Sequence, residues 1–311
     1  MSDYTDKINV GVVGVGHLGA LHARVYSQIK SANLVGVCDV DKKRAKKVGR
    51  KHKVWYFADF SELFDKVQAV SIAVPTSMHY RIAKEFLIHG IHVLVEKPIT
   101  STYEEADELV RLATERNLIL QVGHIERFNP AVRAMEPFIT NPKFIEGQRM
   151  GPFSKKARVK DVGVVLDLMI HDIDLILGLM GTDVKHIEAV GASSVSKFED
   201  MANVRLTFRN GVICDITASR ITKEEIRKIR IFQEDSYILL DLLHKEAYIF
   251  KKIDGIIKKD KIKILKTEPL KEELKSFINC VRSGTRPIVS GEEGRKALGV
   301  ALSILETMQT R

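Results

Sequence analysis

A glycine-rich turn near the N-terminus is the feature that most constrains the fold of this chain. Residues 8–26, INVGVVGVGHLGALHARVY, combine a short apolar strand, a turn with three glycines, and a stretch with apolar positions at helical spacing. In such a strand–turn–helix unit the first glycine permits the tight turn, the second lets the backbone approach a pyrophosphate, and the third lets helix and strand pack closely. The unit therefore offers these candidates for cofactor binding: Gly14, Gly16, His17, Leu18 and Gly19.

A second strand supplies the acid that such a site needs. The segment ANLVGVCDV ends near Asp39, twenty residues after Gly19, where a carboxylate is expected to accept hydrogen bonds from the adenosine ribose hydroxyls. Because a carboxylate repels a 2′-phosphate, the sequence favours NAD over NADP as the cofactor. Three cations follow and reduce that repulsion in part: Lys42, Lys43 and Arg44.

Strands and helices continue to alternate up to residue 123. The strand segments QAVSIAVP, HVLVEKP and LILQVGH are separated by helical segments, which predicts a parallel, doubly wound sheet of the Rossmann type. Ligands of such sheets bind beyond the carboxyl ends of the strands. One rim is therefore expected to carry Pro75, Thr76, His79, Glu96, Lys97, Pro98 and His124.

The pattern changes after this point. Five segments between about residues 186 and 243 alternate apolar and polar residues and are joined by short turns, which predicts a mainly antiparallel sheet. The last forty or so residues return to amphipathic helices. A length of 311 residues suits two domains, so we expect an α/β protein with a Rossmann domain at residues 1–123 and an α+β domain with an open sheet at residues 124–311.

The formal net charge of +9 permits two interpretations, attraction of nucleic acid or attraction of small anionic ligands. Much of the excess lies in residues 249–266, IFKKIDGIIKKDKIKILK, where apolar residues alternate with lysine around an Asp254-Gly255 turn. A hairpin with a solvated face explains this alternation better than a nucleic-acid surface, and the sequence has no zinc-finger spacing or RNP motif. We therefore expect no nucleic-acid partner.

The N-terminus and the cysteines indicate the compartment. No apolar run approaches the ~20 residues that span a bilayer, and MSDYTDKINV lacks the character of a signal peptide. These features predict a cytoplasmic protein without a membrane partner. Cys38, Cys214 and Cys280 lie far apart in apolar surroundings, which predicts buried thiols and no metal site.

The segment VVLDLMIHDIDLIL, residues 164–177, is apolar but carries ionisable groups. On a helix, Asp167 and His171 stand four residues apart and project from one face, so both can act on the same substrate atom. Asp172 and Asp174 fall on other faces, where capping, a salt bridge or solvent exposure explains them. Taken alone, His171 is more simply a core histidine than a catalytic one.

The motifs together resemble the Gfo/Idh/MocA family of sugar and cyclitol dehydrogenases over nearly the whole chain. The matching segments are GVVGVGHLGALHA, CDVD, AVPTSMHY, VEKPIT, VGHIERFNP, DVGVVLDLMIHDID and SFINCVRSGTRPIVSGEEGRKAL. The resemblance implies an NAD-dependent enzyme that oxidises a secondary hydroxyl of a sugar to a ketone. It also implies a C-terminal domain whose open sheet forms oligomer interfaces, in a homodimer or homotetramer.

The resemblance also implies roles for three residues. Lys97 matches the lysine of the family's Glu-Lys-Pro turn, and Asp167 with His171 matches the family's Asp-x-x-x-His pair. Oxidation of an alcohol needs a hydride acceptor and a group that takes the hydroxyl proton. Lys97 is the expected proton acceptor, His171 shares or relays the proton, and Asp167 orients His171 or holds a sugar hydroxyl.

Within the family, GHIERFNPAV followed by RVKDVGVVLDLMIHDID is most similar to the UDP-N-acetylglucosamine 3-dehydrogenase branch. An inositol dehydrogenase or another dehydrogenase of unactivated sugars is the alternative, and an NAD redox-sensing binding protein is the non-enzyme alternative. A nucleotide-sugar diphosphate would need cations, which the sequence offers at Arg149, Lys155, Lys156, Arg158 and Lys160, with Arg158 as first choice. The expected substrate-binding set is Lys97, His124, Arg149, Arg158, Asp167 and His171.

Overall fold

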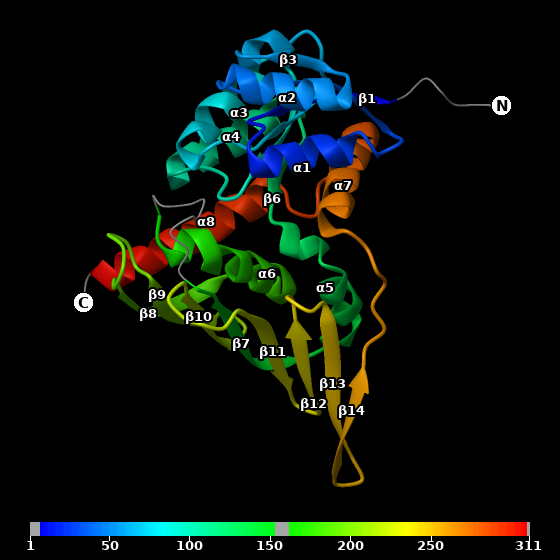
Figure 1. The fold of residues 1–311 in the computed structure, drawn as a ribbon. Helices are drawn as coiled ribbons and strands as arrows, with labels where there is room; N and C mark the ends of the chain where they lie inside the picture. The colour runs from blue at the N-terminus through cyan, green and yellow to red at the C-terminus, as the bar shows by residue number, and fades with distance from the viewer. Residues whose placement is uncertain (1–6, 153–161, 310–311) are drawn as a thin grey trace, which may run out of the picture. The chain divides into compact units, whose positions relative to one another are not determined.

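The structure of this chain is a computed structural model that describes residues 7–152 and 162–309. The chain divides into two compact units (Figure 1). The N-terminal unit contains the residues up to Ile125 together with Glu268–Arg295, and the C-terminal unit contains Glu126–Thr267 and the residues from Lys296 onward. The first boundary lies close to the expected one, but the return of residues 268–295 to the N-terminal unit was not expected.

The N-terminal unit is built on a six-stranded parallel sheet, as the sequence predicted. Its strands lie in the order β3 (Trp55–Phe57), β2 (Ala32–Cys38), β1 (Ile8–Val13), β4 (Ala69–Ile72), β5 (His92–Glu96) and β6 (Leu120–Gly123). The helices that alternate with them are α1 (His17–Tyr26), α2 (Lys42–His52), η1 (Phe60–Leu63), η2 (Thr76–Met78), α3 (His79–Ile88) and α4 (Tyr103–Glu115). This order places the carboxyl ends of β1, β4 and β5 side by side.

Helix α7 (Pro269–Ser283) explains why the chain returns to this unit. It packs against α1 and β1, and its apolar face, which includes Leu274 and Phe277, joins the core of Val10, Val12 and Tyr26. Helix α8 (Gly291–Gln309) begins in the same unit, where Gly291 and Gly294 lie so close to β6 that a Cβ would touch Leu120 or Val122. The hydrophobic core of the N-terminal sheet is therefore completed by residues close to the C-terminus of the chain, in α7 and the start of α8.

The C-terminal unit contains an eight-stranded sheet. The strand order is β14 (Ile256–Lys261), β13 (Glu246–Ile253), β12 (Ser236–Asp241), β11 (Ile226–Gln233), β7 (Pro142–Met150), β10 (Ile213–Ser219), β9 (Met201–Phe208) and β8 (Val184–Ala192). All neighbours are antiparallel except β7 and β10, so the sheet is mainly antiparallel, as predicted. The helical elements are η3 (Ile125–Phe128), α5 (Pro130–Met135), η4 (Glu136–Phe138), the π-helical turn η5 (Val165–Met169) and α6 (Ile170–Met180).

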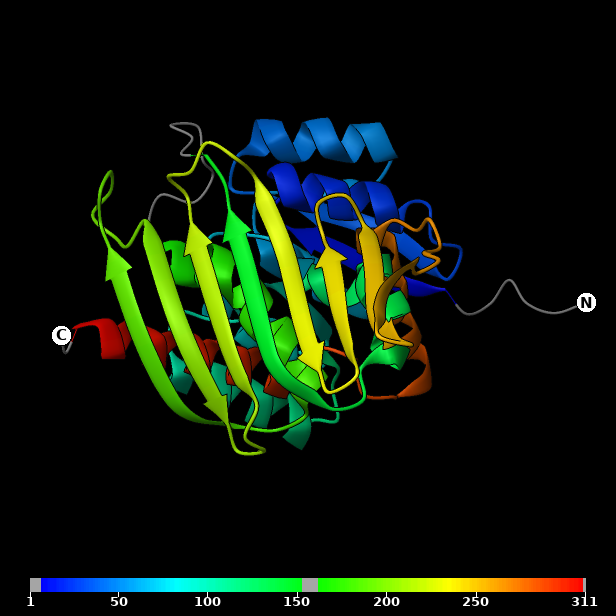
Figure 2. The ribbon, with the colours of Figure 1, turned by 90° about the horizontal axis from the view of Figure 1, so that it is seen from below.

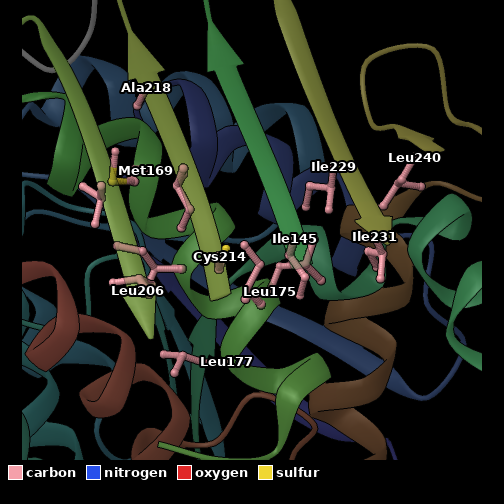
Figure 3. Packing of buried hydrophobic residues seen from close by; sticks show 14 of the residues in the cluster. Ile145, Met169, Leu175, Leu177, Leu206, Cys214, Ala218, Ile229, Ile231 and Leu240 are labelled. Carbon is pink, nitrogen blue, oxygen red and sulfur yellow. The ribbon is translucent and has the colours of Figure 1, made fainter. Parts of the chain in front are cut away.

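One face of this sheet forms the core of the unit. Inward residues such as Ile145, Leu206 and Cys214 alternate along the strands and pack on Met169 and Leu175 of the helical layer (Figure 3). The opposite face is not covered by any described helix (Figure 2). The sheet is therefore open on one side, as the family resemblance implied.

Two smaller predictions are also confirmed. The β13–β14 hairpin turns through Asp254 and Gly255, whose φ angles are 53° and 80°, and every residue of β14 is exposed. The three cysteines are buried and free of disulfides.

Among the described residues, no helix is both long enough and apolar enough to cross a bilayer.

Candidate active site

The glycine turn after β1 has the geometry that dinucleotide binding requires. Gly14 has a φ of 81°, and a Cβ there would lie 2.5 Å from the Ala73 carbonyl oxygen, while a Cβ on Gly19 would lie 1.7 Å from the Gly14 oxygen. A Cβ on Gly16 would meet nothing within 4 Å, so open space faces this glycine. The N-terminus of α1 follows directly, without a side-chain cap or an acidic residue in its first turn. The turn can therefore approach a pyrophosphate with its backbone.

Asp39 lies beside this turn as predicted. Its side chain is 4% exposed, and its carboxylate accepts a hydrogen bond from the Val15 N–H at 2.9 Å and another from the Asp41 N–H at 2.9 Å. The Arg44 guanidinium, half exposed, donates to the same carboxylate at 3.2 Å. Asp39 is thus held at the end of β2, where a ribose would meet it. Arg44 was identified from the sequence as a nearby cation, but its ion pair with Asp39 was not predicted.

The rim after β4 and β5 separates into exposed and buried members. Pro75 is exposed, and Thr76 and Lys97 are half-buried, but only 1% of His79 is exposed. The Nδ1 of His79 lies 2.8 Å from the Pro98 oxygen and its Nε2 lies 2.9 Å from the Val74 oxygen. Burial lowers the pKa of His79, and these two contacts oppose the shift only in part. Both ring nitrogens of His79 contact backbone carbonyl oxygens, whereas we expected the ring to contact the cofactor.

Glu96 is also engaged within the unit. Its Oε1 lies 3.0 Å from Nε2 of the fully buried His22 of α1. Burial acts to raise the pKa of the Glu96 carboxyl, but His22 and the charges of Lys97 and His79 outweigh it, so this pKa lies below its ordinary value. Glu96 is therefore a carboxylate at neutral pH. His124, another expected rim residue, is 1% exposed at the end of β6.

In the C-terminal unit, Asp167 and His171 lie on one continuous helical segment, as predicted, and both are half-buried. Its first turn, Val165–Met169, is π-helical rather than α-helical, and Asp167 lies within it. π-Helical turns inside longer helices are frequent at functional sites. The segment thus places a carboxylate one turn before an imidazole.

The start of this helical segment is held by residues that sequence reasoning missed. Glu199 accepts from the Val165 N–H through Oε1 at 3.1 Å, and from the Val164 N–H through its backbone oxygen at 3.0 Å. A Cβ at position 163 would lie 1.8 Å from the Glu199 carboxylate, so a larger residue there would displace that carboxylate from the Val165 N–H. Arg220 joins this anchor, donating to Asp200 at 2.9 Å and to the Val162 oxygen at 3.1 Å.

Arg149 has a structural environment that its place in a basic run did not suggest. It is 4% exposed and donates to Asp172 through Nε at 2.9 Å and Nη2 at 2.8 Å, and to Glu126 through Nη1 at 3.1 Å. Burial raises the pKa of Asp172 above its ordinary value despite the opposing charge of Arg149. Arg149 therefore joins β7 to α6 and η3, and we leave it out of the phosphate site proposed below. Asp172 has the salt bridge that its position suggested.

The remaining predicted cations lie outside the described residues. These are Lys155, Lys156, Arg158 and Lys160. The described residues resume at Val162, whose carbonyl oxygen accepts a hydrogen bond from Arg220. The expected role of Arg158 therefore remains a prediction.

A doubly wound parallel sheet, a glycine turn open at its second glycine and a buried acid at the end of the second strand define a dinucleotide-binding protein. Comparison with known proteins gives the family. The family model described as "Oxidoreductase family, NAD-binding Rossmann fold" matches residues 8–124, and the GFO/IDH/MocA C-terminal domain matches residues 132–238. The chain belongs to the GFO/IDH/MocA oxidoreductase family, and its cofactor is NAD.

Two relatives illustrate the range of the family. UDP-N-acetylglucosamine 3-dehydrogenase of Acidithiobacillus ferrooxidans is 36% identical over 304 residues, which cover 96% of each chain. Its solved structure matches with a TM-score of 0.93 at 34% identity, over 98% of this chain and 99% of that chain. The scyllo-inositol 2-dehydrogenase (NAD(+)) of Bacillus subtilis is 28% identical over 319 residues, which cover 96% of this chain and 93% of that protein. The resemblance stated from the sequence is thereby confirmed.

Proposed function

We propose that this protein oxidises the C3 hydroxyl of UDP-N-acetylglucosamine to a ketone with NAD. The observation that carries the proposal is the 36% identity, over 96% of both chains, to a dehydrogenase named for that reaction. The structural match at a TM-score of 0.93 supports the proposal. It covers 98% of this chain and 99% of that chain, so neither chain has a large insertion relative to the other. We assign the acid–base work of alcohol oxidation to Lys97, Asp167 and His171.

Each of these residues has a chemical task in the proposal. NAD, when bound, accepts the hydride. The glycine turn and Asp39 hold the cofactor through its pyrophosphate and ribose. Lys97, which directly follows β5, takes the hydroxyl proton in its neutral amine form. His171 shares or relays this proton, and Asp167 orients the imidazole or holds a sugar hydroxyl.

Substitution of the acid–base residues tests these assignments. Lys97→Ala and His171→Ala should keep NAD binding and lose turnover by roughly 10²- to 10⁴-fold, as is typical of removing an acid–base group. Turnover is followed by NADH absorbance, and NADH binding by fluorescence. Near-normal rates in both variants would remove Lys97 and His171 from the mechanism.

The nucleotide part of the substrate needs a cation remote from the reacting carbon. We assign this task to Arg158, since a planar guanidinium suits phosphate oxygens. Arg158→Ala should raise KM for the UDP-sugar more than it lowers kcat, because a remote contact contributes mostly uniform binding. Loss of a charge-assisted bond of ~1.5 to 3 kcal/mol corresponds to a decrease in kcat/KM on the order of tenfold to a hundredfold.

A dehydrogenase of inositols or unactivated sugars is the second candidate, favoured by the 28% identity to scyllo-inositol 2-dehydrogenase (NAD(+)). An assay of NADH formation across UDP-sugars, inositols and free hexoses separates the two. Turnover of inositol or glucose with no UDP-sugar accepted would establish the second candidate. Absence of turnover with every compound, together with tight NADH binding, would favour the redox-sensing alternative.

We also propose that the open face of the eight-stranded sheet joins copies of this chain. Four aromatic side chains form a continuous row across strands β7, β11, β12 and β13 on that face. Phe144 lies 5.7 Å from Phe232, which stacks at 4.9 Å on Tyr237, which in turn stacks at 4.9 Å on Phe250, by ring centroids. Such a row is the kind of apolar surface that marks a protein–protein contact.

A further inference from the structure

Two buried histidines contact the residues on either side of Lys97. His22 comes from α1 and lies 3.0 Å from the Glu96 carboxylate. His79 comes from α3 and lies 2.8 Å from the Pro98 carbonyl oxygen. The exposed fractions of His22 and His79 are 0% and 1%, so neither ring is placed to meet a ligand from solvent. Their contacts are directed at the turn that carries Lys97.

His79 spans two turns of the rim. Its second nitrogen lies 2.9 Å from the Val74 oxygen, in the turn after β4, while the first faces Pro98 in the turn after β5. Carbonyl oxygens only accept hydrogen bonds, so the ring is the donor in this bridge: a neutral imidazole holds one carbonyl and an imidazolium holds both. The ring therefore lies between the two turns, with one nitrogen against a carbonyl oxygen of each.

Glu96 is confined on both sides. Its side chain is 12% exposed and meets His22 on one side. On the other, the carboxylate lies close to Gly123 of β6, where a Cβ would be 3.1 Å away. The titratable groups that act on Glu96 are His22 from α1, His79 from α3 and the adjacent Lys97. The side chain of the residue before Lys97 thus lies between His22 and Gly123.

We propose that His22 and His79 are positioning residues that fix the Glu96-Lys97-Pro98 turn and thereby aim the Lys97 amine at the hydroxyl it deprotonates. This inference rests on the proton-accepting role of Lys97 in the proposed function. It predicts that the two histidines act on the rate through Lys97 and have little effect on cofactor binding. A residue displaced by about 1 Å costs on the order of a hundredfold in rate.

The test compares histidine variants in two backgrounds. In the otherwise wild-type enzyme, His22→Leu and His79→Leu should each lower kcat by roughly tenfold to a hundredfold, with KM and the NADH dissociation constant changed by less than about threefold. His22→Gln and His79→Gln keep a donor and should recover part of kcat. In a Lys97→Met background, the same substitutions should lower the residual rate no further, since their effect passes through the missing amine.

His92 supplies the matched control. It lies at the start of β5, the strand that ends at Glu96, and its Nδ1 accepts from the Ile119 N–H at 2.9 Å. His92→Leu should lower the melting temperature and leave kcat unchanged. The melting temperature of every variant is measured, and the glutamine variants carry the test if a leucine variant does not fold.

The outcomes separate the two proposals. Equal losses in the wild-type and Lys97→Met backgrounds would show that the histidines support the fold only, and unchanged kcat in both histidine variants would also overturn the inference. If Lys97→Met itself turns over at a near-normal rate, the proposed function fails at Lys97, whatever the histidine variants do. Loss of kcat confined to the Lys97-containing enzyme supports the inference.

Discussion

Replacement of Arg149 by Met should destabilise the C-terminal unit strongly. Methionine retains much of the aliphatic length but removes the cation from two carboxylates, Asp172 and Glu126, whose side chains are 2% and 11% exposed. Removing one partner of a buried ion pair costs about 3–5 kcal/mol, because the remaining charge stays buried without compensation. For a unit of this size, that loss corresponds to a decrease in melting temperature of roughly 6–20 °C.

Calorimetry of three proteins tests this magnitude: wild type, Arg149→Met, and Arg149→Met combined with Asp172→Asn and Glu126→Gln. The triple variant removes both charges and should recover most of the loss. The pH dependence supplies an independent check. When the pKa of a carboxyl is higher in the folded than in the unfolded protein, the free energy of unfolding falls as the pH rises between the two pKa values. Burial raises the pKa of Asp172 even beside Arg149, so the single variant should be least stable near neutral pH and regain stability as the pH falls towards the ordinary aspartate pKa.

Two results would refute the reasoning. A loss below about 1 kcal/mol would be typical of a surface ion pair and would mean that the three side chains are hydrated. A triple variant as unstable as the single variant would mean that lost packing of the arginine stem, rather than unpaired charge, sets the cost.

Three further predictions concern the cofactor, the pH response and assembly. Asp39→Ser should narrow the preference for NAD over NADP, since Arg44 would then be free to meet a 2′-phosphate; titration of both cofactors measures this, and an unchanged ratio contradicts it. Burial lowers the pKa of His92, so the stability that the neutral ring provides is lost as pH falls below about 6.5; His92→Gln should flatten that part of the melting-temperature profile, and an identical profile would rule His92 out. Phe232→Glu should yield a smaller assembly in size-exclusion chromatography with light scattering, whereas Trp55→Glu, at an exposed position in the N-terminal unit, should not; equal masses would exclude the sheet face as the contact.

The parts of the fold that sequence predicted are those that local chemistry determines. The glycine turn, the acid at the end of β2 and the turn at Asp254-Gly255 each depend on a few neighbouring residues, and all three have the expected conformation or position. The return of α7 to the N-terminal unit was missed for the opposite reason. An amphipathic helix shows that it has an apolar face but not which surface that face will cover.

Two site residues show the same limit. His79 follows the rim turn in sequence, and nothing local indicates that its ring turns inward to the Pro98 and Val74 carbonyls. Arg149 was grouped with nearby cations, yet its alternation with Ile145 and Gly147 along β7 indicates the buried face. That period-2 signal was available in the sequence. The partner Asp172 was not, because it lies 23 residues away on another element.

The discontinuous N-terminal unit has a consequence for how the chain is made. Residues Glu126–Thr267 separate its first part from α7, so a ribosome must add 142 residues before the covering helix is synthesised. At a synthesis rate of roughly 5–20 residues per second, the apolar surface of α1 and β1 stays without α7 for about 7–30 s. During that interval the nascent chain presents an apolar surface that chaperones and proteases recognise.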